Sequence, residues 1–295
     1  YDVYQVGGNV QGTAVLQMLN ILEGYELSET GFATAETFHL FIEAKKLVFE
    51  DRAKHYTDSD FYEIPYETLL SKEYAAERRK LIGETAREDI STGVDVLEDG
   101  DTIYLTTADQ YGNMVSLIQS NFRGMGTGFV VPGTGFSFQN RGELFSLDPE
   151  HPNVYEPGKR PFHTIIPGFI MKDGKPFMTL GNMGGAYQPM GHISLITNVI
   201  DFGMNMQQAG DALRWAHSGS TQPTDALSDH LTNVGLVTFE STVDRQVVRD
   251  LRAMGHRVRV GEGFFGRFQA IMRDLETGVY YGASESRVDG QAAGY

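Results

Sequence analysis

Cysteine is absent from the 295-residue chain. This absence excludes disulfide bonds, thiolate metal sites and a cysteine nucleophile, and it suits a cytosolic or a secreted protein, so the compartment stays open. Long hydrophobic runs are also missing: none approaches the ~18 apolar residues of a membrane span, and we expect no membrane partner. The first residues show neither an initiator methionine nor a signal-peptide pattern. We therefore expect a fragment whose front is missing.

Positive charge is scarce, with 24 Lys+Arg against 39 Asp+Glu and a net charge of -15. Such a chain repels phosphate backbones, so nucleic acid is not an expected partner. The eight histidines form no His-x-x-x-His or His-x-His pair, and we expect no metal. The glycine run 124–128 superficially matches a dinucleotide fingerprint. Because residues 129–131 continue it as a predicted strand, not a helix, we expect no nucleotide cofactor either.

Hydrophobic periodicity divides the chain into a helical front and a mixed remainder. Helical spacing predicts helices over 10–22, 35–55 and 72–82, and the helix 35–55 has Lys45, Lys46, Asp51, Arg52 and Lys54 among its polar positions. Further helices are predicted over 193–202, 206–216 and 243–254, and strands over 165–171, 176–180, 257–260, 268–273 and 278–282. This order predicts a layered α+β sandwich with a mostly antiparallel sheet.

At Thr102 the periodicity changes from helical to alternating. Residues 102–108 and 114–120 are predicted to form a hairpin around the turn 109–113. If Asp109 pairs with Asn113, the register sets Thr102 opposite Ser120, about 5 Å away at Cβ, where a second hydroxyl can orient the first. A slip by one residue would place Asn121 there instead.

An acidic, glycine-containing loop precedes Thr102. If the bond between Asp101 and Thr102 were cleaved, Thr102 would carry a hydroxyl nucleophile and a free α-amine with a pKa near ~8, which can act as general base. An ordinary strand-opening threonine explains the same residue. In the loop 181–185, the N–H groups of Gly184 and Gly185 can converge on an oxyanion, although a simple tight turn fits equally well.

Several segments together resemble the γ-glutamyltranspeptidase family of N-terminal-nucleophile (Ntn) hydrolases, and more closely its branch of transpeptidase-like and cephalosporin (glutaryl) acylases. The segments that carry the resemblance span nearly the whole chain: 16–22, 43–47 with 51–52, Thr102 with Asp109 and 112–113, 126–128, 158–161, 184–185, and 290–295. The resemblance implies a four-layer αββα sandwich. It also implies a precursor that cleaves itself before a threonine.

The resemblance assigns roles by position. Thr102 matches the nucleophile, so residues 1–101 would end the large subunit and 102–295 would be the small catalytic subunit, the two subunits being each other's partners. The front of the large subunit, which supplies a substrate-binding arginine in the family, would be absent. Ser120 matches a hydroxyl bonded to the nucleophile, and Gly184 and Gly185 match the oxyanion pair. His163 and Thr164 fall where transpeptidases hold the substrate α-carboxylate.

Three departures from the family bear on the substrate. The acidic residue that holds the γ-glutamyl α-amine is matched by Leu144, with Glu143 beside it, a glutamine is matched by Arg141, and an asparagine by Phe122. Losing an anion and gaining a guanidinium favours a carboxylate-bearing acyl group. We expect hydrolysis or transfer of amides of glutaryl-like, polyglutamyl or γ-glutamyl groups, with Arg141, Glu143, His163, Thr164 and Asn121 as candidate substrate contacts. The alternative is a non-catalytic binding or scaffold homologue that has lost self-cleavage.

Overall fold

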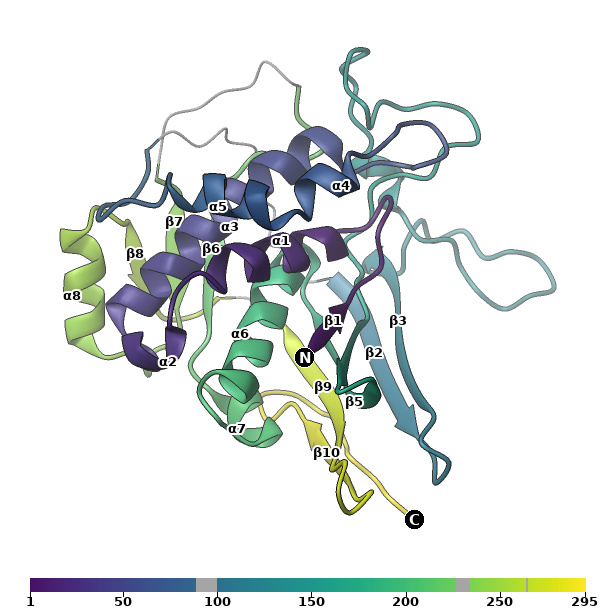
Figure 1. The fold of residues 1–295 in the computed structure, drawn as a ribbon. Helices are drawn as coiled ribbons and strands as arrows, with labels where there is room; N and C mark the ends of the chain where they lie inside the picture. The colour runs from purple at the N-terminus through teal and green to yellow at the C-terminus, as the bar shows by residue number, and fades with distance from the viewer. Residues whose placement is uncertain (89–99, 227–233, 264) are drawn as a thin grey trace.

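The fold is built from a helical layer, a five-stranded sheet and a two-stranded ribbon (Figure 1). The computed structural model describes residues 1–88, 100–226, 234–263 and 265–295. Its helices are α1 (Gly12–Leu22), α2 (Leu27–Thr30), α3 (Ala35–His55), α4 (Tyr66–Leu69), α5 (Lys72–Arg79), α6 (Gln188–Ile200), α7 (Met206–Asp211) and α8 (Arg245–Ala253). No helix in these ranges is long and apolar enough to cross a membrane.

The strands form three sheets. They are β1 (Asp2–Tyr4), β2 (Gly100–Ala108), β3 (Met114–Arg123), β4 (Gly168–Lys172), β5 (Lys175–Met183), β6 (Trp215–Ser218), β7 (Leu236–Phe239), β8 (Val258–Val260), β9 (Arg267–Arg273) and β10 (Tyr280–Ser284). The main sheet has the order β1-β4-β5-β9-β10 and is antiparallel throughout. Helices α6 and α7 pack against it, α1 lies on α6, and the ribbon β2–β3 packs on β5 and β9. A smaller sheet, β6-β7-β8, adjoins α8. The predicted α+β class is confirmed.

The long helix α3 has the predicted bounds, but the prediction for its polar positions was wrong in part. Of the five residues assigned to polar positions only Lys54 is exposed, and the others are buried. The helix lies between α1 and α8, so more than one of its faces is covered. The buried charges are paired instead of solvated: Lys46 lies 2.7 Å from Glu43, and Arg52 donates to Gln11 at 2.8 Å.

Two other predicted elements differ from the structure. The helix expected over 206–216 ends at Asp211, and Trp215 begins the strand β6, because the buried Arg214 is fixed by Glu285 and by the carbonyls of 265 and 266. The strand expected over 129–131 is only an isolated bridge between Val130 and Ser137. Phe129 and Val130 are 61% and 54% exposed, so little burial stabilises a longer strand there.

The hairpin β2–β3 has the predicted register, with Thr102 opposite Ser120. Asp109 N–H donates to the Asn113 carbonyl at 3.0 Å, as expected for the turn. The register shifts by one residue between Asp101 and Thr102, so Asp101 lies opposite Phe122. The hairpin therefore carries an irregularity at the bond that the sequence marked for cleavage.

Two contacts between β2 and β5 show how the two strands run past each other. Thr106 Oγ1 lies 2.5 Å from Thr179 Oγ1, and the buried Tyr104 ring packs directly over Gly181. Two residues along β2 thus correspond to two residues along β5 in the opposite direction. Continued by two residues, this correspondence would set Thr102 beside Met183, the last residue of β5, which immediately precedes Gly184.

Replacing Gly181 by alanine is expected to separate the two layers. The added Cβ would lie 2.1 Å from the Tyr104 ring, which is fully enclosed, so strand or ring must move. We expect a loss of about 1–3 kcal/mol in the free energy of unfolding, measured by thermal and urea denaturation. Gly83→Ala is the control, because its Cβ would meet no atom within 4 Å, and we expect a change within about 0.5 kcal/mol. Equal effects of the two substitutions would contradict the close packing of β2 on β5.

Candidate active site

Thr102 and Ser120 form a pair of bonded hydroxyls. Thr102 is only 6% exposed, and its Oγ1 donates to Ser120 Oγ at 2.9 Å. Ser120 Oγ also accepts the N–H of Phe122 at 2.9 Å. Phe122 reaches this geometry with a φ of 75°, in the left-handed region that a residue with a side chain rarely adopts. The turn after Ser120 thus fixes the hydroxyl that contacts Thr102.

Arg141 lies next to this pair, at the start of the short helix η1 (Arg141–Leu144). It is 1% exposed; Nη1 donates to the Ser120 carbonyl at 3.2 Å, and Nη2 contacts Thr164 Oγ1 at 3.5 Å. Its guanidinium lies 4.9 Å from the centre of the Phe122 ring. Burial lowers the pKa of Arg141 to about 10, so it stays charged at neutral pH. No carboxylate in the described residues pairs with it.

Of the next two candidate substrate contacts, one touches Arg141 and the other contacts a different segment. Thr164 is buried and touches Arg141. His163 is half-buried, and its Nδ1 lies 2.7 Å from the Pro161 carbonyl and 3.2 Å from Asn9 Nδ2. Burial lowers the pKa of His163, which keeps its ring neutral at pH 7. The structure thus brings Thr164 to the Arg141 side and holds the His163 ring against another segment.

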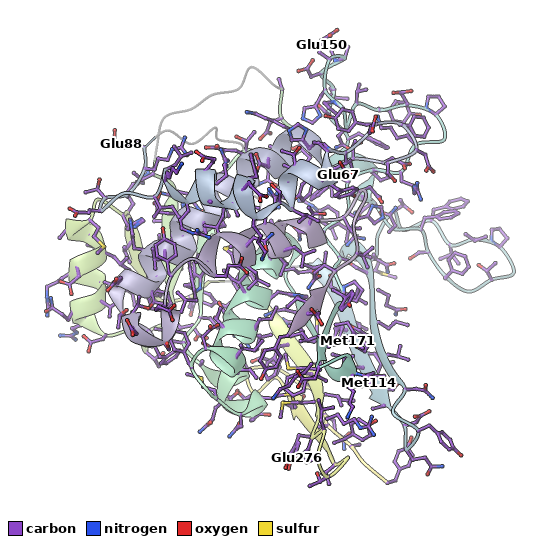
Figure 2. The ribbon with its side chains drawn as sticks, viewed as in Figure 1. Glu67, Glu88, Met114, Glu150, Met171 and Glu276 are labelled. Carbon is purple, nitrogen blue, oxygen red and sulfur yellow. The ribbon has the colours of Figure 1, made fainter. Side chains whose placement is uncertain are left out.

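Glu143 and Asn121 have partners of their own. The Glu143 carboxylate lies 2.6 Å from Arg123 Nε and its side chain is 41% exposed. The Asn121 carbonyl accepts the N–H of Asn140 at 3.2 Å. The connection after η1, whose outer end carries Glu150 (Figure 2), extends away from the layers of the fold before returning at His163.

Gly184 and Gly185 form the turn between β5 and α6. Their φ values of 130° and 54° require residues without a Cβ. The Gly184 carbonyl accepts the N–H of Tyr187 at 2.9 Å, which fixes the peptide plane that carries the Gly185 N–H. In the described part of the chain, none of the loop and turn hydrogen bonds is donated by Gly184 or Gly185. Neither N–H is therefore used in these bonds, and both glycines directly follow β5, the strand against which β2 packs.

Gln11 completes the site and was not singled out from the sequence. It is fully buried, and its Nε2 donates to the Thr164 carbonyl and to the Gly185 carbonyl, each at 2.7 Å. A glutamine just before an apolar helix carries no distinguishing sequence signal, because glutamine is common at solvent-exposed helix starts. Contacts therefore link Thr102 through Ser120, Arg141, Thr164 and Gln11 to Gly185.

One group in the described ranges has the composition of a metal site. The ligand atoms of the buried His39, Glu43 and His256 lie within 4.8 Å of one another. These atoms already have partners: His39 Nδ1 lies 2.8 Å from His256 Nε2, and Glu43 pairs with Lys46 at 2.7 Å. None of these residues belongs to the site around Thr102.

Comparisons with known proteins give matches that cover all or nearly all of the chain. The model of a family described as gamma-glutamyltranspeptidase matches residues 1–295. The "glutathione hydrolase-like YwrD proenzyme" of Bacillus subtilis (strain 168) is 37% identical over 297 residues, which cover 100% of this chain and 54% of the relative. The "acylase ACY 1 proenzyme" of Pseudomonas sp. (strain SE83) is 33% identical over 298 residues, with 98% and 50% covered.

A solved structure, that of cephalosporin acylase from Bacillus halodurans, is 46% identical. It superposes with a TM-score of 0.83 over 99% of this chain and 51% of the other. This similarity confirms the predicted four-layer αββα class, of which three layers are seen here. The chain spans about half the length of the relatives that it matches.

Proposed function

Because the chain belongs to the γ-glutamyltranspeptidase family, we propose that it carries the catalytic residues of a self-processing amidohydrolase or acyltransferase with Thr102 as nucleophile. The observation that carries this proposal is the 2.9 Å contact from Thr102 Oγ1 to Ser120 Oγ, across the hairpin β2–β3 and with Thr102 buried. The relatives are named proenzymes, which supports self-processing.

Self-cleavage would divide the chain between Asp101 and Thr102. The Thr102 hydroxyl attacks the Asp101 carbonyl carbon, an ester forms as the peptide C–N bond breaks, and the Thr102 nitrogen takes up the hydroxyl proton. Water then hydrolyses the ester, leaving a carboxyl group on Asp101 and a free amine and hydroxyl on Thr102. The register shift between these two residues supports this bond as the cleavage site. Residues 1–101 then belong to one subunit, and 102–295 form the other.

Turnover would use the same hydroxyl. Thr102 Oγ1 attacks the carbonyl carbon of a substrate amide, and the new α-amine accepts the hydroxyl proton and passes it to the leaving amine. The N–H groups of Gly184 and Gly185 stabilise the oxyanion, and Ser120 orients the nucleophile. Water or a second amine releases the acyl group from the ester, which gives hydrolysis or transfer.

The acyl group would carry a carboxylate. Arg141 is a buried cation beside Ser120, and a substrate carboxylate would provide the counter-charge that the described residues do not. A bidentate contact with a guanidinium is strong in such a site. Glu143, the candidate ligand for an α-amine, is occupied by Arg123. These contacts support a glutaryl-type acyl group over a γ-glutamyl one, with Thr164 on the same side and His163 and Asn121 as outer contacts.

The front of the large subunit would complete the fold. Ile103, Leu105, Val115 and Leu117 are 45–60% exposed on the outer face of the ribbon, although they alternate with residues that face β5. An apolar sheet face of this kind needs a covering layer. The half of the relatives' length that this chain does not span is the proposed source of the fourth layer.

A panel of three anilides tests the substrate class with the full-length gene product. Glutaryl, γ-glutamyl and pentanoyl anilides differ only in the carboxylate and the amine. We expect kcat/KM for the glutaryl anilide to exceed that for the pentanoyl anilide by about 10–100-fold, since a charge-assisted hydrogen bond contributes about 1.5–3 kcal/mol. We also expect kcat/KM for the glutaryl anilide to equal or exceed kcat/KM for the γ-glutamyl anilide.

A strong preference for the amine-bearing anilide would contradict the interpretation of Arg141 and Glu143. A denaturing gel of the same protein gives an independent test of self-processing. If a single band persists and no anilide is cleaved, the protein is the non-catalytic homologue instead.

A further inference from the structure

We propose that Gln11 is a positioning residue for this reaction, resting on the proposed function above. It holds the Gly184–Gly185 turn, which stabilises the oxyanion, in register with the segment at Thr164, which binds the acyl carboxylate. The two segments come from different parts of the fold, and a single buried amide bonds to both.

Gln11 uses its side-chain amide at both ends. Nε2 has two hydrogens, and the carbonyls of Thr164 and Gly185 accept them at 2.7 Å each. Oε1 accepts Nη1 of Arg52 at 2.8 Å. The side chain is fully buried, so water does not compete for these bonds. Loss of the two N–H donors would leave the buried Thr164 carbonyl and the half-buried Gly185 carbonyl without these bonds, which is unfavourable for groups shielded from water.

Arg52 determines which way the amide points. A guanidinium only donates hydrogen bonds, so it must face Oε1, and Nε2 must then face the two carbonyls. Arg52 is itself held within α3, with its guanidinium 3.6 Å from the centre of the Phe49 ring and Nη2 donating to Gln222 at 2.6 Å. A flipped amide would place Nε2 against the cation and Oε1 against two carbonyl oxygens. The orientation is therefore unique.

The backbone before α1 holds Gln11 close to both partners. A Cβ on Gly12 would lie 2.2 Å from the Val6 carbonyl, so only glycine lets the chain fold this tightly into the helix. The preceding residues run beside the Thr164 segment: Val10 forms a bridge with His163, and the His163 N–H donates to the Asn9 carbonyl at 2.6 Å. From this support the Gln11 side chain reaches across to Gly185.

The consequence for catalysis is geometric. Gly185 gains a second fixed contact besides the Gly184–Tyr187 bond, and a displacement of about 1 Å in a catalytic group can cost about 10²-fold in rate. Because oxyanion donors act mainly in the transition state, an error in their position lowers kcat more than it raises KM.

Gln11→Met in the full-length precursor, compared with Gln17→Met, tests this proposal. Gln17 is a matched control within α1, the helix that Gln11 directly precedes. It is also buried, it donates to Asp51 at 2.8 Å and accepts from Tyr56 at 2.5 Å, and these bonds reach no residue of the site. We expect both variants to lower the melting temperature. Only Gln11→Met is expected to lower kcat for the glutaryl anilide, by at least tenfold. We expect its KM to change less than threefold. We also expect this variant to cleave itself more slowly.

Gln11→Glu is the second variant, chosen to preserve folding. A glutamate keeps the size of the side chain and pairs with Arg52, but it donates no hydrogen to the two carbonyls. We expect the same fall in kcat. A kcat within threefold of that of Gln17→Met for either folded variant, or a change confined to KM, would overturn the role of Gln11. Failure of the wild-type protein to cleave any amide would overturn the proposed function instead.

Discussion

Thr102→Ala is expected to abolish both self-cleavage and amide turnover of the full-length protein. The substitution removes the hydroxyl that donates to Ser120 Oγ, and alanine is compatible with the strand. Without a nucleophile neither ester can form, and the loss of turnover should exceed about 10³-fold, as for removal of a catalytic nucleophile in other acyl-transfer enzymes. Denaturing gels follow cleavage, and anilide hydrolysis follows turnover.

Two variants on the same strand serve as controls for Thr102. Thr106→Ala removes another inward-facing hydroxyl, bonded to Thr179 at 2.5 Å, and should lower stability but leave self-cleavage intact. Thr102→Ser keeps a hydroxyl and should retain part of both activities. Appreciable turnover by Thr102→Ala, or a loss of cleavage in Thr106→Ala equal to that in Thr102→Ala, would contradict the assignment of the nucleophile.

Arg141→Met is expected to remove the preference for carboxylate-bearing substrates. We expect kcat/KM for the glutaryl anilide to fall by about 10–100-fold, because a charge-assisted contact is lost, and that for the pentanoyl anilide to stay within about threefold. The free energy of unfolding should be unchanged or higher, since an apolar side chain replaces a buried cation that has no acidic partner in the described residues. Anilide kinetics and urea denaturation measure the two effects.

Arg123→Met provides the matched control for Arg141. Both guanidinium groups lie against the Phe122 ring: Arg123 is 5.3 Å and Arg141 4.9 Å from the ring centre. Arg123, however, is paired with Glu143 at the surface. We expect Arg123→Met to leave the ratio of kcat/KM for the glutaryl and the pentanoyl anilides unchanged, because neither anilide has an amine that the released Glu143 could bind. Equal losses of Arg141→Met on the charged and the uncharged anilide would show that Arg141 supports the site without binding a carboxylate.

The sequence predicted the local features of the site well. The hairpin register that pairs Thr102 with Ser120 follows from strand alternation and from the turn after Asp109, both of which are determined by neighbouring residues. Helix α3 likewise has its predicted bounds, since Thr34 caps its start with an oxygen that accepts the Thr37 N–H.

Features that depend on distant partners could not be predicted. Lys46 and Arg52 look solvent-exposed in a helical pattern, but segments distant in the sequence cover them: Lys46 donates to the Arg87 carbonyl and Arg52 donates to Gln222. The end of α7 depends on Arg214, whose partner Glu285 is 71 residues away. The role of Gln11 depends on carbonyl groups more than 150 residues away, which carry no side-chain signature at all.

The buried contacts of Gln11 and Arg52 connect residues on the two sides of the proposed cleavage bond. Both residues precede the proposed cleavage bond, whereas Thr164, Gly185 and Gln222 follow it. Once the chain is cut, these bonds join two separate polypeptides, and neither carries a complete set of supports. If the proposed cleavage takes place, dissociation of these two polypeptides would therefore also break the contacts that position the catalytic groups.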